Sequence, residues 1–199
     1  MRLISVNGET TVHHVDERPW KCTIWLLSCN KVPTDFLHNW FNYGLIFAIS
    51  CENEARHPLN PYADDAAFKL FLVDVGLLGA MAGLDKETVV GGSDIFEEFK
   101  GSLTEQYVCQ QLVSDCGLTP YYWSAENSSG EIDFLVQKAN GVYAIEVKAE
   151  ENLRAKSLRA FKESHPEIRS VRFSLSGYRE QDWMRNVPLY AMSNMGLWG

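Results

Sequence analysis

The sequence has no long apolar run and no nucleotide-binding loop. None of its apolar stretches approaches the roughly 20 residues that a membrane-spanning helix needs. The first residues, MRLISVNGE, lack the apolar centre of a secretory signal peptide. The pattern G-x-x-x-x-G-K-[ST] is also absent, which excludes a P-loop ATPase within this chain. We therefore expect a cytoplasmic protein with no membrane partner and no ATPase activity of its own.

Zinc-type ligand patterns and positive net charge are lacking as well. The 5 cysteines form no C-x-x-C pair, and the histidines lack ligand spacing, so we expect reduced cysteines and no zinc. The formal net charge of −8 opposes non-specific binding to nucleic acid. Basic residues do gather in the last part of the chain: Arg154, Lys156, Arg159, Lys162, Arg169, Arg172, Arg179 and Arg185. This balance permits DNA binding without arguing for it.

What the sequence does contain is a predicted hairpin with charged residues inside apolar strands. The strands read EIDF at 131–134 and IEVK at 145–148. Because strand side chains alternate between faces, Glu131 and Asp133 are expected on one face and Ile132, Phe134 and Val136 on the other. A second acid and a lysine, Glu146 and Lys148, alternate in the same way on the second strand.

The turn of this hairpin sets the expected register. The dipeptide Asn140-Gly141 favours a two-residue type I′ turn, which would place Asp133 opposite Lys148. Glu146 would then be a diagonal neighbour of Asp133 on the same face, within reach of a single ion.

This arrangement suits a hard divalent cation. Mg²⁺ prefers oxygen ligands and is usually held by one or two carboxylates, which Asp133 and Glu146 would supply. Lys148 would orient or deprotonate a water, or stabilise charge in a transition state. The alternative is a solvated sheet face on which opposite charges pair.

A further acid lies on a predicted helix from Asp94 to Cys116. Glu105 falls in line with Val108, Cys109 and Leu112 on the apolar stripe, so a helix packed on the sheet would bring Glu105 towards the hairpin acids. The alternative is a glutamate at the edge of the stripe that reaches out to water.

The predicted order of elements is α-β-β-β-α-β. It comprises the helix above, a strand at 121–123, the two hairpin strands, a helix at about 153–164, a strand at 168–175 and a last strand at 188–191. This order resembles the α/β core of the PD-(D/E)XK, or restriction-endonuclease-like, nucleases, built around a mixed sheet. More closely, it resembles the C-terminal domain of unknown function that follows the P-loop domain in many bacterial and archaeal AAA-type ATPases.

Other segments carry the same resemblance, which covers about residues 40–191. They read WFNYGLIFAI at 40–49, HPL at 57–59, FKLFLVDVGLL at 68–78 and KSL at 156–158. The resemblance implies a small, partly winged-helix-like N-terminal unit at 1–64 and the nuclease-like domain at 65–199.

The resemblance also implies roles for the acids and the lysine. Asp133 and Glu146 would hold Mg²⁺ or Mn²⁺, Glu105 would complete the metal site, Lys148 would be the catalytic lysine, and Glu131 would support the ligands without touching the ion.

Three residues outside the hairpin have expected roles as well. Lys156 and Arg159 are candidate phosphate contacts, against the alternative of a solvated helix face. Asp74 is interpreted as a helix N-cap.

Two functions remain open at this stage. One is a Mg²⁺-dependent nuclease that acts on DNA in preference to RNA. The other is a non-catalytic interaction or nucleic-acid-sensing module that partners a separate P-loop ATPase.

Overall fold

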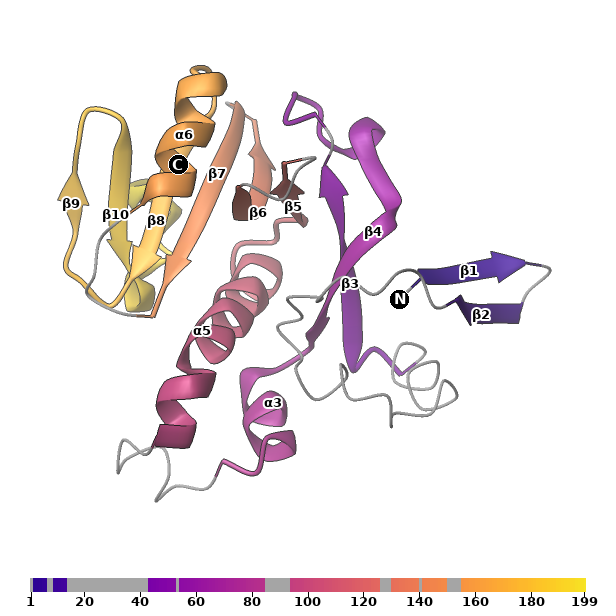
Figure 1. The fold of residues 1–199 in the computed structure, drawn as a ribbon. Coiled ribbons are helices and arrows are strands. Elements are labelled where there is room, and N and C mark those ends of the chain that lie inside the picture. The colour runs from indigo at the N-terminus through magenta and orange to yellow at the C-terminus, as the bar shows by residue number, and fades with distance from the viewer. Residues whose placement is uncertain are drawn as a thin grey trace.

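The computed structural model describes residues 2–6, 9–13, 43–52, 54–84, 94–125, 130–139, 141–149 and 155–199. Within them the fold is mixed α/β, with one eight-stranded mixed sheet and a separate two-stranded sheet (Figure 1). The strands are β1 Arg2–Val6, β2 Glu9–His13, β3 Ile46–Glu52, β4 Ala63–Leu72, β5 Pro120–Ser124, β6 Glu131–Lys138, β7 Gly141–Lys148, β8 Arg169–Ser174, β9 Arg179–Glu180 and β10 Met184–Pro188. The helices are α3 Val75–Met81, α5 Asp94–Ser114 and α6 Lys156–Ser164, with short 3₁₀ turns η1 Asn60–Tyr62, η2 Leu189–Ala191 and η3 Met195–Leu197.

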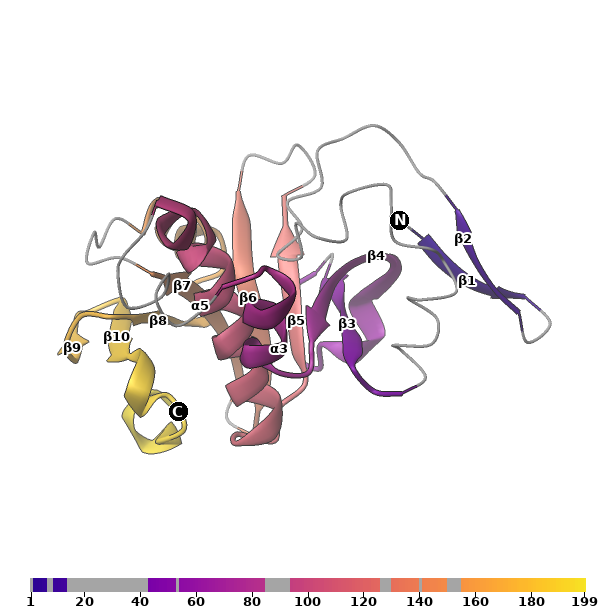
Figure 2. The ribbon, with the colours of Figure 1, turned by 90° about the horizontal axis from the view of Figure 1, so that it is seen from below.

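The large sheet has the order β4-β3-β5-β6-β7-β8-β10-β9 and can be followed from one edge to the other in Figure 2. β5, β6 and β7 are antiparallel neighbours. β8 is parallel to both β7 and β10, because α6 provides the crossover between β7 and β8. The predicted order α-β-β-β-α-β is confirmed from α5 to β8.

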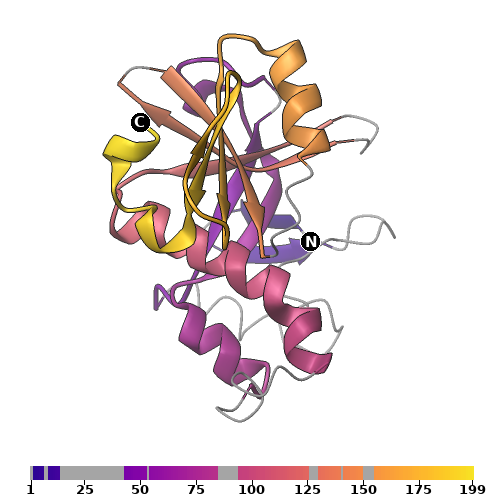
Figure 3. The same cartoon turned by 90° about the vertical axis from the view of Figure 1, so that its left-hand side faces the viewer.

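Two apolar clusters cover the two faces of the sheet. The apolar stripe of α5, with Val108 and Leu112 fully buried, packs on Phe134 and Ile145, and we call this face the α5 side. Leu158 and Phe161 of α6 belong to a second cluster on the other face, the α6 side. Figure 3 shows α5 and α6 from the edge of the molecule.

Several local predictions can be compared with the structure. Asp74 caps α3 as predicted, since its Oδ1 accepts a hydrogen bond of 3.0 Å from the Leu77 N–H. The last strand was predicted wrongly: β10 ends at Pro188, and residues 189–191 form η2 instead. The described cysteines Cys51, Cys109 and Cys116 are all buried, in agreement with core residues.

β3 and the first part of β4, from the expected N-terminal unit, belong to the eight-stranded sheet, whereas β1 and β2 form the two-stranded sheet. The expected boundary between residues 64 and 65 lies inside β4, which pairs with β3, and β3 pairs in parallel with β5. Residues 14–42 of the expected winged-helix-like unit lie outside the described residues. No helix in the described part of the chain is long and apolar enough to cross a membrane.

Candidate functional site

The predicted hairpin exists, but its register differs from the expected one by two residues. Lys138 pairs with Gly141 and Phe134 pairs with Ile145. Gly141 has φ +130° and is already the first residue of β7, so it does not serve as the second turn residue. The Asn-Gly preference would use the positive φ of glycine inside the turn, whereas here Gly141 adopts its positive φ as the first residue of β7. Asn140 lies outside the described residues.

A β-bulge changes which way the first acid points. Tyr121 pairs with Leu135 but Trp123 pairs with Ile132, so Asp133 and the residue after it oppose a single residue of β5. Ile132 and Leu135 therefore both pack on the α6 side. The expectation that Asp133 and Phe134 lie on opposite faces is wrong, because the bulge adds one residue to the alternation and Phe134 packs on the α5 side.

The β6–β7 ladder ends at the pair of Phe134 with Ile145, and the charged residues lie beyond it. We call this end of the hairpin the fork. Asp133 Oδ2 accepts a hydrogen bond of 2.7 Å from the Val147 N–H across the fork. The Asp133 carboxylate thus accepts from a backbone N–H of β7, and this hydrogen bond holds it between the two strands.

On the α5 side, a largely buried lysine forms ion pairs with two of the acids. Lys69 of β4 forms ion pairs with Glu105 of α5, at 3.2 Å between Nζ and Oε1, and with Glu131 of β6. Its Nζ also lies 5.0 Å from the centre of the Tyr122 ring. The Lys69 side chain is only 11% exposed. We call Lys69, Glu105, Glu131 and Asp133 the Lys69 cluster.

The charges of this cluster act on each other. Burial, together with repulsion from Glu105 and more weakly from Glu146, raises the pKa of Asp133 to about 7, although Lys69 and the Val147 N–H oppose the shift. Burial alone would lower the pKa of Lys69, but the charges of Glu105, Glu131 and Asp133 outweigh it and raise that pKa. Lys69 is therefore an ammonium at neutral pH, while the Asp133 carboxyl takes up a proton more readily than an ordinary aspartate.

On the α6 side, the second acid has different partners. Glu146 lies on the opposite face from Ile145 and Val147, and it is paired in register with Arg172 of β8. Lys148 Nζ lies 3.0 Å from Glu146 Oε1. The glutamate is buried, whereas the lysine side chain is 36% exposed.

The buried guanidinium of Arg172 is held by an asparagine. Arg172 Nε donates to Asn186 Oδ1 at 2.8 Å, and the same oxygen accepts from Ser174 Oγ at 2.8 Å. Burial lowers the pKa of Arg172 and the Glu146 charge opposes that shift. We call Glu146, Lys148, Arg172 and Asn186 the Arg172 cluster.

The structure therefore brings Glu105, Glu131 and Asp133 together, and Glu146 with Lys148, but on two sides of the sheet. The charge of Glu146 nevertheless acts on Asp133 across the fork and helps to raise its pKa. Within the described part of the chain, no group of three or more histidine, cysteine, aspartate or glutamate side chains is arranged to hold a metal ion. Two carboxylates would satisfy Mg²⁺, but on the α5 side the cation beside them is already Lys69, so the residues do not fit a bound metal in this arrangement.

The candidate phosphate contacts lie on the exposed surface of α6. Lys156 and Arg159 are both exposed. Arg159 Nε forms an exposed ion pair of 3.3 Å with Glu163, one turn along the helix. Their contact with phosphate stays a prediction.

Sequence reasoning missed the two cations that organise the site. Lys69 is a lone lysine in the apolar run FKLFL, and Arg172 is a lone arginine in SVRFS. A charged residue inside an apolar strand needs a partner, so both positions carried a detectable signal. Glu52 was also missed: it is fully buried, and neither carboxylate oxygen has a hydrogen-bond partner among the described residues.

Comparison with known proteins gives one match. Residues 100–192 match the model of a family described as a domain of unknown function, DUF4143. The matched segment includes Glu105, Asp133, Glu146 and Arg172 but not Lys69. No curated protein and no solved structure matches the chain.

Proposed function

We propose that this chain is a non-catalytic interaction module with a nuclease-like core that binds a partner protein, and that the partner is a separate P-loop ATPase. The observation that carries the proposal is the division of the charged residues at the fork. Asp133 and Glu105 are with Lys69 on the α5 side, whereas Glu146 and Lys148 are with Arg172 on the α6 side. A metal-dependent nuclease needs the acids and the lysine around one reacting phosphate.

The charge of each cluster supports the same proposal. Each acid of the fork lies near a cation of the protein. Glu146 has Lys148, and Asp133 shares Lys69 with Glu105 and Glu131. The excess charge on that side is relieved by protonation, as the raised pKa of Asp133 indicates. Protonation of Asp133 thus reduces the negative charge that a divalent ion would neutralise on the α5 side.

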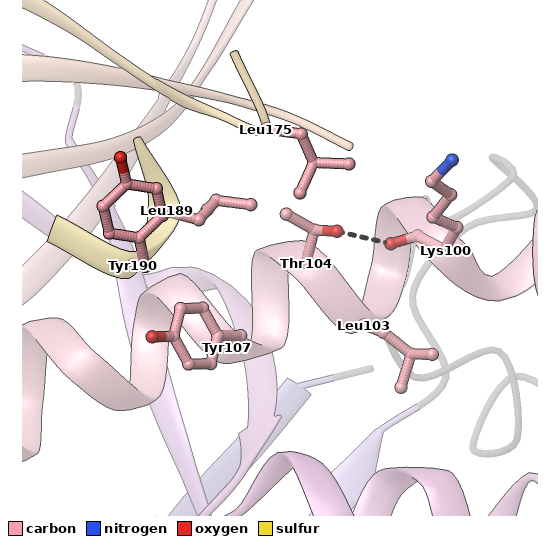
Figure 4. Close-up of a pocket in the computed structure, with 7 residues that line it drawn as sticks. All are labelled: Lys100, Leu103, Thr104, Tyr107, Leu175, Leu189 and Tyr190. Carbon is pink, nitrogen blue, oxygen red and sulfur yellow. Dashed lines mark hydrogen bonds between the residues drawn. The ribbon is translucent and has the colours of Figure 1, made fainter. Parts of the chain in front are cut away.

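An open apolar groove supports the binding of a protein partner. It is lined by residues of α5, of η2 and of the segment after β8: Lys100, Leu103, Thr104, Tyr107, Leu175, Leu189 and Tyr190 (Figure 4). Tyr190 is 84% exposed and Leu175 is 56% exposed. Exposed apolar side chains gathered in one place are typical of protein interaction sites.

A second candidate function is the Mg²⁺- or Mn²⁺-dependent nuclease acting on DNA. It is favoured by one observation, namely that the charges of both Glu105 and Glu146 raise the pKa of Asp133. Three carboxylates thus act on each other across the fork, and a divalent ion would relieve their repulsion if the two sides moved together.

Cleavage assays distinguish the two functions. The purified chain is incubated with supercoiled plasmid, single-stranded DNA and RNA in the presence of Mg²⁺ or Mn²⁺, and we expect no cleavage. Cleavage that is lost in both Asp133→Asn and Glu146→Gln, but kept in the exposed control Glu167→Gln, would establish the nuclease instead. In that case Lys148→Ala should lower turnover more than metal affinity.

The groove is tested by binding. A P-loop ATPase from the same cell is titrated with wild-type chain and with Tyr190→Ser, and the variant should bind at least about tenfold more weakly, since exposed tyrosines are frequent anchors at interfaces. Tyr178→Ser is the matched control, because Tyr178 is also exposed but does not line the groove. Equal loss in both variants, or in neither, would exclude the groove as the binding surface.

A further inference from the structure

We infer that the ammonium of Lys69 is the resident cation of the fork and fills the place that a divalent ion would need. This inference deepens the proposed function and rests on it, because it explains why the acids do not hold a metal.

The position of Lys69 Nζ disfavours a metal ion on the same acids. Nζ lies 3.2 Å from Glu105 Oε1. An ion bound to that oxygen at about 2.1 Å could therefore be no farther than about 5.3 Å from Nζ. At such a distance, and with the Lys69 side chain largely buried, the two positive charges repel strongly.

The ammonium also satisfies the acids as a cation would. Glu105 and Glu131 each form an ion pair with the ammonium, and the face of the Tyr122 ring lies beside it. The charges of Glu105, Glu131 and Asp133 hold it in the protonated form. Lys69 comes from β4, so it joins α5 to β6 across the two strands that lie between β4 and β6.

Removal of the ammonium should therefore create a divalent-ion site. In Lys69→Met the apolar stem is retained while three carboxylates lose their common counter-charge. Two or three such carboxylates on rigid elements are the ligands that Mn²⁺ and Mg²⁺ take.

The experiment is a titration of Mn²⁺, followed by the electron paramagnetic resonance of the free ion and by the melting temperature. It compares wild type, Lys69→Met, and Lys69→Met with Asp133→Asn. We expect Lys69→Met to bind Mn²⁺ at least tenfold more tightly than wild type and to gain melting temperature with Mn²⁺. The added Asp133→Asn should remove both effects. Lys156→Met, an exposed lysine on α6, makes the same change of charge and should behave as wild type.

The outcomes separate the inference from the proposed function. If Lys69→Met gains no Mn²⁺ affinity, the inference is wrong, while a wild type that cleaves nothing leaves the proposed function intact. If wild type already binds Mn²⁺ at Asp133, the inference is overturned, and cleavage by that complex would overturn the proposed function as well.

A variant that does not fold without metal still gives a result. Lys69→Met combined with Glu131→Gln carries less repulsion, and recovery of its folded circular dichroism on addition of Mn²⁺ supports the inference. A double variant that folds without gaining Mn²⁺ affinity contradicts it.

Discussion

The two sides of the fork neutralise their acids with different cations. On the α6 side, Arg172 lies directly opposite Glu146 in the parallel β7–β8 register and is fixed by Asn186. On the α5 side, Lys69 reaches its acids from a strand that is not adjacent to β6. The difference shows that four charged residues of one hairpin need not form one site, because a single bulge at Asp133 assigns them to two.

The comparison predicts the largest loss of stability for Arg172. Replacing Arg172 by Leu leaves the buried Glu146 with Lys148 alone and leaves Asn186 without its guanidinium partner, so unfolding free energy should fall by about 3–5 kcal/mol. Chemical denaturation measures this. Arg159→Leu, which breaks an exposed ion pair, should cost no more than about 1 kcal/mol. Equal losses in the two variants would contradict the view that Arg172 organises the α6 side.

The two lysines of the site, Lys69 and Lys148, should also differ in how much each stabilises the fold, with the more buried one contributing more. Lys69→Met should cost about 2–3 kcal/mol, less than a fully buried pair because Glu105 and Glu131 are partly exposed. Lys148→Met should cost less than about 1 kcal/mol, since its side chain is 36% exposed. Denaturant titrations of both variants at low and high salt check the order, and a reversed order would break the comparison.

Glu52 extends the comparison to a buried acid that has no cation beside it in the described structure. Burial raises the pKa of Glu52 to about 7 from its ordinary value of 4.5. The folded state thus binds more protons than the unfolded state between these values, and stability falls as the pH rises through this range. Glu52→Gln removes this loss, so at pH 8 it should be more stable than wild type by about 2 kcal/mol. At pH 4 the two proteins should be nearly equal, and a difference independent of pH would contradict the assignment.

The smaller of the two pH-dependent effects is expected at Asp133. Its pKa of about 7 is also raised above the ordinary value of 3.8, so ionisation between these values destabilises the fold. Asp133→Asn keeps an acceptor for the Val147 N–H but deprives Lys69 of one negative charge, so the gain at pH 8 relative to pH 5 should be only about 1 kcal/mol. Melting curves over this range test the sign. A variant that becomes relatively less stable as the pH rises would show that ionised Asp133 is stabilising.

The sequence predicts the parts of the site that local patterns control. The apolar spacing around Glu105 gives α5 and its orientation, and Asp74 is recognisable as a cap before α3. The alternation of β7 places Glu146 and Lys148 on one face, as expected.

The rest depends on interactions between distant segments. A bulge is a property of two paired strands, so the change of face at Asp133 cannot be obtained from the period of β6 alone. The partners of Lys69 are likewise set by the order of strands in the sheet. The strand β10 was misplaced because its sequence, MRNVP, contains an arginine and the buried Asn186 of the Arg172 cluster, so it lacks an apolar strand pattern.

The most direct test of the account is a crystal structure of the wild-type chain grown or soaked with Mn²⁺, examined by anomalous scattering at the manganese edge. We predict no anomalous peak at the fork, with Lys69 Nζ between Glu105 and Glu131 beside Asp133. A peak coordinated by Asp133 and Glu146, with Lys69 displaced from Glu105, would contradict the account and establish a metal site at the fork.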